Sequence, residues 1–310
     1  DSTKEIIGIH AFIPYSHFDE NLQTSEIFLS IWKVKEQLSI PGLGLRTLNF
    51  IKEEFKPRLI QAMAFIESIE PLYKRLGFET DYLSHFVLIN PKIKDFLVAK
   101  NVNNIKAIAI DELKEDLYKL STGESDLLAE LDEIDIDSLC KDIIPKKSKN
   151  FFLQKYFKHP NYSYKCCICL DSSNKPLFIF IYRVIICRSS KILRIVDFAG
   201  SEKHLESVSR QILELVIEEN AEYLDFYQFG LNPSYLKKAN FIDRKDLEAL
   251  IIPNYFEPFD QKNVDLNCAY LADSSDHKKL MGFIKVMEIK TDLHFYSRIN
   301  LLIRSNYVKK

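Results

Sequence analysis

The sequence predicts an α/β (α+β) fold built from two tandem modules, each a mixed sheet with helices on both faces. Three observations lead to this prediction. The stretch 26–50 reads as strand, glycine loop and helix; strands and short helices alternate through the first hundred residues; and the later part of the chain repeats the order. Such an order is typical of mixed sheets covered by helices. We predict module boundaries at 1–100 and 101–310.

The stretch 26–50 is the centre of the first module. Residues 26–34, EIFLSIWKV, read as a strand rich in large apolar residues, and the helical spacing of apolar residues starts at Leu45. Between them lies Pro41-Gly42-Leu43-Gly44. Glycines let a backbone approach a ligand closely, and a helix that follows directs free N–H groups and its positive dipole end to the same place. The pattern therefore predicts an anion-binding loop.

The other elements of the first module follow from the same signals. We expect a helix at 67–76, closed by Gly77, and strands at 4–12, 59–65 and 78–90. Because the first strand starts almost at residue 1, the sequence opens in the middle of a sheet. The first module is therefore expected to lack its leading strand and helices.

The second module is predicted to follow the same plan. Its expected strands are 105–110, 162–170, 176–187, 192–198 and 222–229, and its expected helices are 111–120, 201–220 with Ser201 as cap, and a short one in 233–241. The tail is expected to add closing strands, including 264–270 and 280–289. The stretch 121–149 is acidic and reads as a surface excursion. Its cofactor loop, Gly200 to His204, has no second glycine and carries Glu202, so this module looks degenerate as an anion site.

Composition excludes several classes of protein. A net charge of −2 with interspersed charges gives no reason to expect a nucleic-acid partner. No apolar run is long enough to span a membrane, and the first residues lack a secretory pattern, so we expect a cytoplasmic protein that does not bind membranes. Cys166, Cys167 and Cys169 lack the partners that a zinc site needs, so we predict buried small side chains and no metal. Alternation puts Cys167 and Cys169 on one face.

Two motifs resemble the core of GNAT-type acyl-CoA N-acyltransferases. In that family the pyrophosphate loop reads Gln or Arg, two residues, Gly, one residue, then Gly or Ala, and this pattern falls on Ser39 to Gly44. Both glycines match, whereas Ser39 replaces the family's Arg or Gln. The helix PLYKRLGF is similar to the family's helix with its tyrosine at Tyr73. In the second module, Leu236 aligns with Tyr73 and Asn240 with Gly77.

The resemblance implies an acyl-CoA, such as acetyl-CoA, as co-substrate, and a set of binding residues: Val34, Ser39, Pro41, Gly42, Leu43, Gly44 and Leu45. It implies that the backbone N–H of Val34 polarises the thioester carbonyl and that Tyr73 donates a proton to the CoA sulfur. Glu26 would be the general base, with Glu36, His10 and His17 as competitors. Each has a plain structural alternative: Tyr73 as a helix residue, Glu26 as a solvated strand-edge carboxylate, and His10 as a core residue.

The expected function is acyl transfer, in which the acceptor attacks the thioester directly. The leading reaction is N-acetylation of an amino sugar or another small amine. The chain also resembles tandem GNAT proteins of bacterial surface-polysaccharide biosynthesis, which implies a nucleotide-linked amino sugar as acceptor. Two alternatives stay open. One is an aminoacyl transferase that uses charged tRNA, and the other is a non-catalytic binding or scaffold protein of the same fold. The second module would shape the acceptor pocket or support the first.

Overall fold

The computed structural model describes residues 6–22, 26–35, 40–102, 105, 107–123, 134–141, 143–254 and 260–272. These fall into two compact units. Unit 1 contains the described residues up to Asp81 together with 267–272, and unit 2 contains those from Tyr82 to Leu266. Residues 82–100 thus belong to unit 2, and 267–272 to unit 1, which differs from the predicted division at residue 100. No helix in the described part of the chain is long and apolar enough to cross a membrane.

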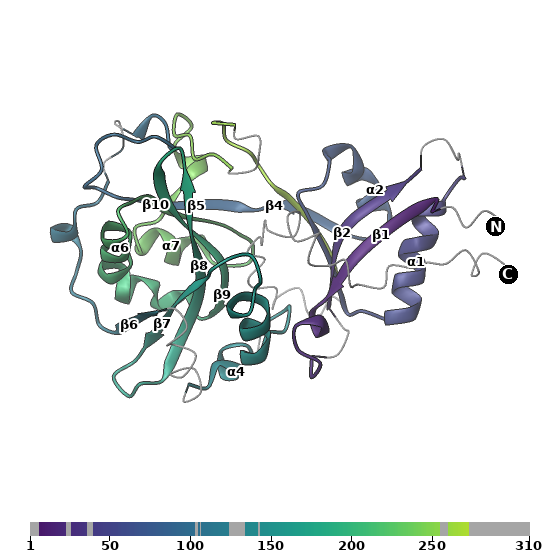
Figure 1. Ribbon diagram of the computed structural model, residues 1–310, viewed down its shortest axis with the longest axis horizontal. Coiled ribbons are helices and arrows are strands. Elements are labelled where there is room, and N and C mark those ends of the chain that lie inside the picture. The colour runs from purple at the N-terminus through teal and green to yellow at the C-terminus, as the bar shows by residue number, and fades with distance from the viewer. Residues whose placement is uncertain are drawn as a thin grey trace. The chain divides into compact units, whose positions relative to one another are not determined.

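Unit 1 is a five-stranded mixed sheet in the order β1-β2-β3-β12-β4 (Figure 1). Its strands are β1 (Gly8–Pro14), β2 (Glu26–Val34), β3 (Leu59–Met63), β4 (Glu79–Tyr82) and β12 (Asn267–Ala272). β2 and β3 run parallel, and β1 and β12 flank them in the antiparallel direction. The helices are η1 (Tyr15–His17), α1 (Leu43–Phe55), η3 (Glu67–Ile69) and α2 (Glu70–Arg75). The predicted strand, glycine loop and helix are confirmed.

The helix α1 packs its apolar face on the sheet. Leu48 and Ile51 are buried together with Ile27 and Leu29 of β2. The start of α1 lies beside Trp32 of β2, because a Cβ on Gly44 would come within 2.9 Å of that ring. The predicted helix 67–76 forms as η3 and α2. Gly77 follows it with φ +86°, the left-handed conformation that ends helices and that glycine adopts without strain.

Unit 2 is a seven-stranded mixed sheet in the order β11-β5-β10-β9-β8-β7-β6. Its strands are β5 (Ser84–Ile89), β6 (Lys119–Gly123), β7 (Lys165–Leu170), β8 (Pro176–Cys187), β9 (Ser190–Gly200), β10 (Ala221–Gln228) and β11 (Ile242–Asp243). Its helices are η5 (Ile110–Glu112), α4 (Ile136–Leu139), α5 (Lys149–Phe152), η6 (Leu153–Phe157), η7 (Glu202–Val208), α6 (Ser209–Glu218), α7 (Pro233–Lys238) and η8 (Arg244–Asp246). Figure 1 shows α6 and α7 on one side of the sheet and α4 on the other.

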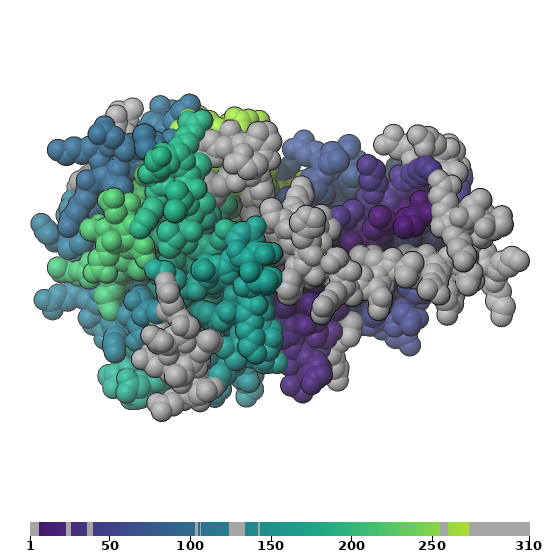
Figure 2. Space-filling view, in the orientation of Figure 1, coloured from purple at the N-terminus to yellow at the C-terminus, as the bar shows by residue number. Residues whose placement is uncertain are grey.

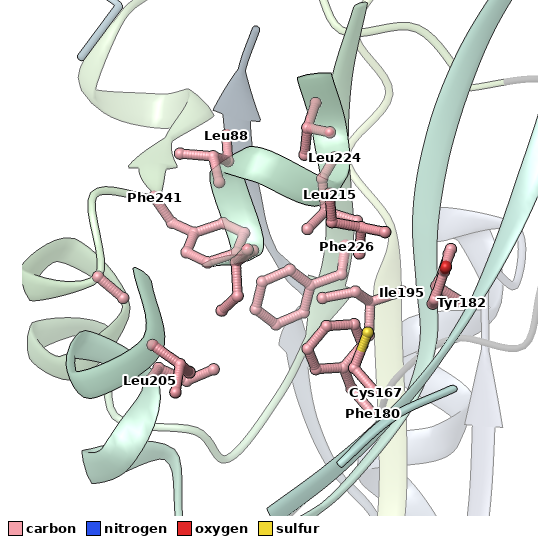
Figure 3. Close-up of a cluster of buried hydrophobic side chains, with 14 of the residues drawn as sticks. Leu88, Cys167, Phe180, Tyr182, Ile195, Leu205, Leu215, Leu224, Phe226 and Phe241 are labelled. Carbon is pink, nitrogen blue, oxygen red and sulfur yellow. The ribbon is translucent and has the colours of Figure 1, made fainter. Parts of the chain in front are cut away.

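The main core of unit 2 lies between its sheet and the helices α6 and α7. Figure 3 shows Phe180 and Ile195 of the sheet and Phe241 converging with Leu215 of α6. Cys167 and Cys169 lie in the same cluster, whereas Cys166 is buried outside it. The predicted role of these cysteines as buried small side chains is therefore confirmed.

The two sheets repeat one order of elements. In unit 1, β2, α1, β3, α2 and β4 follow one another, and in unit 2, β9, α6, β10, α7 and β11 do the same. In each sheet the strand between the last two comes from elsewhere in the chain: β12 lies between β3 and β4, and β5 between β10 and β11. The predicted single strand 78–90 is therefore wrong. It forms β4 and β5 of different sheets, separated at Leu83, whose N–H donates to Leu266.

We expect a fragment of residues 1–100 not to fold alone. Without β12 the ladder on β3 from Leu59 to Met63 loses its antiparallel partner, and the buried Ala269 is removed from the core of unit 1. An exposed strand edge and an open core leave too little buried apolar surface for stable folding. Circular dichroism of the fragment during heating should show no cooperative transition, and a sharp transition like that of the whole chain would contradict the role given to β12.

One further prediction for unit 2 is wrong, and another needs adjustment. The stretch 105–120 was expected to be a strand and a helix, but its described residues form a loop with the short helix η5, and β6 starts at Lys119. The helix expected at 201–220 forms as the 3-10 helix η7 followed by α6, and Ser201 is the N-cap residue of η7, although its side chain makes no capping hydrogen bond. In the loop before β6, Asp116 accepts hydrogen bonds from the N–H groups of Arg210 and Gln211 at the start of α6.

The strand β1 is at the edge of its sheet in the described part of the chain. Ile9 of this strand is 44% exposed, and Ile6, two residues before the strand begins, is 65% exposed. Atoms of this N-terminal part, drawn in purple, reach the surface in the space-filling view (Figure 2). The predicted strand 280–289 of the tail lies outside the described residues.

Candidate functional site

The parallel strands β2 and β3 separate part-way along β2. Their pairing covers Glu26 to Leu29 opposite Leu59 to Ala62, and β3 ends one residue later. β2 continues to Val34, paired with β1. No described strand pairs with the other edge of β2 beyond Leu29. The second half of β2 therefore offers backbone groups to a ligand.

The direction of these backbone groups follows from the pairing with β1. The N–H of Lys35 donates to the carbonyl of Ile7 over 2.9 Å, and Val34 lies opposite Gly8. Bonded and non-bonded pairs alternate along antiparallel strands. The N–H of Val34 therefore points away from β1, toward the free edge. This orientation is the one that the predicted role of Val34 requires.

A β-bulge lies just before this free stretch. Ala11 pairs with Ile31 and Phe12 with Leu29, so Ser30 has no partner on β1. Bulges re-aim the side chains that follow them and are frequent beside active sites. Here the bulge puts Trp32 on the same face as Leu29, where it packs against the core beneath α1. Sequence reasoning missed Ser30, because nothing in its residue type signals a bulge.

The helix α1 follows β2 in the chain and begins at Leu43. Gly42 is its N-cap, with φ +73°, and a Cβ there would meet nothing within 4 Å. The N–H of Leu43 donates to Ile40, and no side chain caps the helix. In the described chain the N–H groups of Gly44 and Leu45 have no hydrogen-bond partner. Such free groups at a helix start are suited to bind an anion.

Gly44 permits a close approach between α1 and β2. A Cβ at this position would lie 2.9 Å from the indole nitrogen of Trp32 and 3.3 Å from two of its ring carbons. Real Cβ atoms do not come this close to a ring, so only glycine fits here without displacement. The second glycine of the predicted loop is therefore required by packing against Trp32, while the first is required by backbone conformation.

A chain of contacts joins this turn to β1. The hydroxyl of Thr47 donates to the carbonyl of Gly44 over 2.7 Å, and its oxygen lies 3.0 Å from Nδ1 of His10. The imidazole stacks on Trp32 at 4.8 Å with an angle of 3° between the rings. Because Thr47 uses its only hydrogen on Gly44, its oxygen accepts from His10, which fixes the Nδ1–H tautomer. Nε2 of His10 is buried without a hydrogen-bond partner.

Burial lowers the pKa of His10 from 6.5 to about 4, so the imidazole is neutral at pH 7. Unfolded His10 binds a proton near pH 6.5, whereas the folded protein holds it neutral down to about 4. The unfolded state therefore binds more protons between these values, and stability falls as the pH falls through this window.

When the pH falls from 7 to 5, we expect the free energy of unfolding to decrease by about 2 kcal/mol because of the lowered pKa of His10. Urea unfolding of the wild type and of His10→Gln at both pH values measures it, since the variant lacks the titrating group. The wild type should lose about 2 kcal/mol more than the variant. Equal losses in both proteins would show that His10 is not held neutral by the fold.

Tyr73 lies on α2 with its ring in the core of unit 1. It is 4% exposed and contacts Trp32 edge-on at 6.1 Å, with Phe65 and Phe78 at 4.8 and 5.0 Å. Burial raises the pKa of its hydroxyl to about 12, so the phenol stays protonated at neutral pH. The contact with Trp32 brings Tyr73 to the free half of β2. A protonated phenol there can serve as an acid.

Glu26 lies at the start of β2 and is 1% exposed, so it is not the solvated carboxylate of the structural alternative. Its Oε1 accepts from Nη2 of Arg58 at 2.5 Å and from Nε at 3.2 Å. Eight residues separate it from Val34, about 26 Å along an extended strand. The ion pair with Arg58 is a sufficient structural reason for the burial of Glu26. The role of Glu26 as general base stays a prediction.

The remaining predicted residues are distributed as follows. Pro41 forms the turn before Gly42. Ser39 and Glu36 lie outside the described residues. His17 is on η1, and partial burial lowers its pKa. In the part of the chain that the structure describes, no three His, Cys, Asp or Glu side chains gather as a metal site would require.

The corresponding helix of unit 2 has no free start. Asp116 accepts from the N–H groups of Arg210 and Gln211 over 3.2 and 3.1 Å, at the same two helix positions as Gly44 and Leu45 in α1. A carboxylate of the chain itself thus occupies the place of an anionic ligand. The sequence indicated Glu202 for this place, and the residue that fills it was missed because it lies 94 positions away from Arg210.

The second unit shares the other features of the site. β9 and β10 pair up to Arg194 and Asp225 and then separate, and Val196 of β9 has no partner on β8. On the strand after this bulge, Asp197 accepts a hydrogen bond from Tyr156 over 2.6 Å and is paired with Lys147. All three side chains are buried. Unit 2 therefore repeats the geometry with a helix start and strand residues that are already partnered.

This chain is similar in structure to several solved proteins. No protein-family model matches the sequence, and no curated protein matches it. Similar solved structures include a GCN5-related N-acetyltransferase from Anabaena variabilis (10% identity, TM-score 0.46, 86% of this chain and 58% of that one). A second is N-myristoyltransferase of Saccharomyces cerevisiae with bound myristoyl-CoA (8% identity, TM-score 0.43, 87% of this chain and 64% of that one). A third is a GCN5-related N-acetyltransferase from Kribbella flavida (9% identity, TM-score 0.44, 79% of this chain and 51% of that one). The chain spans 51% to 64% of the length of these three proteins.

Proposed function

We propose that this chain is an acyl-CoA-dependent acyltransferase whose donor binds in unit 1. One observation carries the proposal: no described strand pairs with the outer edge of β2 beyond Leu29, and in the helix that follows, the N–H groups of Gly44 and Leu45 have no partner in the described chain. The equivalent helix start in unit 2 is filled by Asp116. We further propose that the two units are tandem modules of one fold and that unit 1 alone binds the donor.

The chemistry of an acyl-CoA fits this arrangement. Its pyrophosphate is an anion that the N–H groups of Gly44 and Leu45 can bind, with the dipole of α1 in support. Its pantetheine arm carries amide groups, which can pair with the free edge of β2 as a further strand would. The thioester then lies along β2, within reach of the N–H of Val34.

The proposed reaction is direct transfer. The acceptor nitrogen attacks the thioester carbonyl carbon, the N–C bond forms, and the C–S bond breaks. The N–H of Val34 stabilises the negative charge that develops on the carbonyl oxygen. Tyr73, protonated at neutral pH, gives its proton to the departing thiolate, and the proton lost by the acceptor amine passes to a base. His10 and His17 stay candidates for that base, whereas Glu26, about 26 Å along β2 from Val34, could act only through a chain of water molecules.

The acceptor we propose is a small amine, and an amino sugar linked to a nucleotide is the first compound to test. Only the sequence resemblance supports this choice, and the same holds for a role in surface-polysaccharide synthesis. One observation favours the second candidate, a non-catalytic binding protein of this fold: Glu26 is engaged by Arg58, which leaves no free carboxylate at its position. A protein of that kind would bind acyl-CoA without consuming it.

Donor binding is tested with a matched pair of variants at Gly42. Thermal unfolding is recorded with and without acetyl-CoA for the wild type, Gly42→Asn and Gly42→Asp. Ligand at 100 times its dissociation constant stabilises a protein by about 2.7 kcal/mol. Asparagine tolerates the left-handed conformation and occupies open space, so stabilisation should persist. Aspartate has the same shape but repels phosphate, so the stabilisation should be lost. No stabilisation of the wild type by any CoA ester would refute the proposal.

Catalysis is tested separately with a panel of amines and mass spectrometry of the products. The enzyme hypothesis predicts an acetylated amine and free CoA in equal amounts, and a lower kcat with little change in KM for Tyr73→Phe, which keeps the ring but lacks the proton. Acetyl-CoA that binds but is never consumed with any amine would favour the binding protein.

A further inference from the structure

The imidazole of His10 is a buried polar group with one unsatisfied nitrogen. His10 is 1% exposed, its Nδ1–H donates a hydrogen bond to Thr47, and its Nε2 has no hydrogen-bond partner. A buried acceptor without a partner costs about 1–3 kcal/mol, and such a cost in a native protein asks for an explanation. His10 also lies beside the candidate site, because Trp32 contacts both His10 and the start of α1.

Apolar residues would fill this position at lower cost if packing alone mattered. The ring of His10 stacks on Trp32, and phenylalanine would retain such a stack. What histidine adds is two nitrogens, of which the bond to Thr47 uses one. The second, Nε2, carries a lone pair that can only accept a hydrogen bond in the Nδ1–H tautomer.

We propose that His10 contacts the bound ligand, and that its Nε2 accepts a hydrogen bond from an N–H or O–H group of the pantetheine arm of an acyl-CoA. The inference rests on the proposed function, since it assumes that the donor lies along β2 and the start of α1. Trp32 covers one face of the imidazole and is itself partly exposed. The lone pair of Nε2 lies in the plane of the ring, so the arm would reach it past the edge of the indole.

Two substitutions separate the two nitrogens. In His10→Asn the side-chain amide can replace Nδ1 and keep the bond to Thr47, but no atom reaches the position of Nε2. In His10→Gln the longer side chain brings an amide oxygen near that position. Two probes separate the two parts of the ligand: acetyl-CoA carries the arm, and adenosine 3′,5′-bisphosphate carries phosphates without it.

Isothermal titration of the full chain gives the dissociation constants. We expect His10→Asn to weaken acetyl-CoA binding about tenfold, the loss of one hydrogen bond, and to leave the bisphosphate within about twofold. His10→Gln should recover most of the lost affinity for acetyl-CoA. This selective loss and recovery would support the contact, because a purely structural role of His10 would affect both probes alike.

Three outcomes would overturn the inference. If His10→Asn binds acetyl-CoA as tightly as the wild type, Nε2 makes no contact. If it loses affinity for both probes equally, His10 acts only by holding Thr47 and the start of α1. In both cases the wild type still binds acetyl-CoA, so the proposed function survives. If the wild type binds neither probe, the proposed function fails and this inference fails with it.

Discussion

Gly44→Val is expected to weaken acetyl-CoA binding by tenfold or more. The new Cβ would lie 2.9 Å from the indole nitrogen of Trp32, and valine adds two methyl groups to it. The indole is stacked on His10, so relief of the clash must displace either the ring pair or the first turn of α1. Overpacking of this kind costs about 1–3 kcal/mol. Titration calorimetry of the wild type and the variant with acetyl-CoA measures the effect.

Trp32→Leu provides the matched control, because it removes the ring that a side chain at residue 44 would strike. If the clash is the cause, Gly44→Val should weaken binding much less in a Trp32→Leu background than in the wild type. A double-mutant cycle gives the coupling between the two sites. Equal losses in both backgrounds would mean that valine acts on the ligand itself or on the helix, and not through Trp32.

Glu222→Ala is expected to lower the stability of unit 2 by about 3 kcal/mol, the effect of leaving buried donors without acceptors. The carboxylate is fully buried on β10 and accepts four hydrogen bonds from the N–H groups of Leu97, Val98 and Ala99, at 2.7 to 3.0 Å. Val98 and Ala99 are buried as well, so water does not replace the lost acceptor in the folded state. Urea unfolding followed by circular dichroism measures the change.

Two further variants show whether the lost acceptor is the cause. Glu222→Gln keeps the size and one acceptor oxygen, so it should lose less stability than Glu222→Ala. Glu218→Ala removes an exposed carboxylate from α6 and should change stability by less than about 0.5 kcal/mol. Amide hydrogen exchange at Val98 and Ala99 should accelerate in Glu222→Ala. Unchanged exchange there, or a loss of stability below about 1 kcal/mol, would contradict the account.

The parts of the fold set by local sequence were predictable. The apolar residues of β2, the two glycines and the helical spacing after Leu45 gave the strand, loop and helix of the candidate site nearly residue by residue. Gly77 marked the end of α2 through its positive φ, and Asn240, which aligns with it in the second unit, has φ +66° as well. Local conformational preferences decide these features, so a single sequence carries them.

Features that depend on distant partners were not predictable. The segment 78–90 reads as one strand, and only the pairing of its halves in different sheets divides it at Leu83. Residues 111–120 have the pattern of a helix, but tertiary contacts overrule it, among them the two hydrogen bonds that Asp116 accepts from the start of α6. The partners of His10 and Glu26 lie 37 and 32 positions away, so nothing local announced them.

Trp32 offers the most direct test of whether unit 1 binds an acyl-CoA at the start of α1. Trp32 is the single tryptophan of the chain, and it contacts both His10 and the turn at Gly44. Titration of the protein with acetyl-CoA should produce a saturable change in tryptophan emission, which Gly42→Asp abolishes and Gly42→Asn preserves. Emission that stays constant at millimolar acetyl-CoA, or an identical titration curve for Gly42→Asp, would contradict binding at the start of α1.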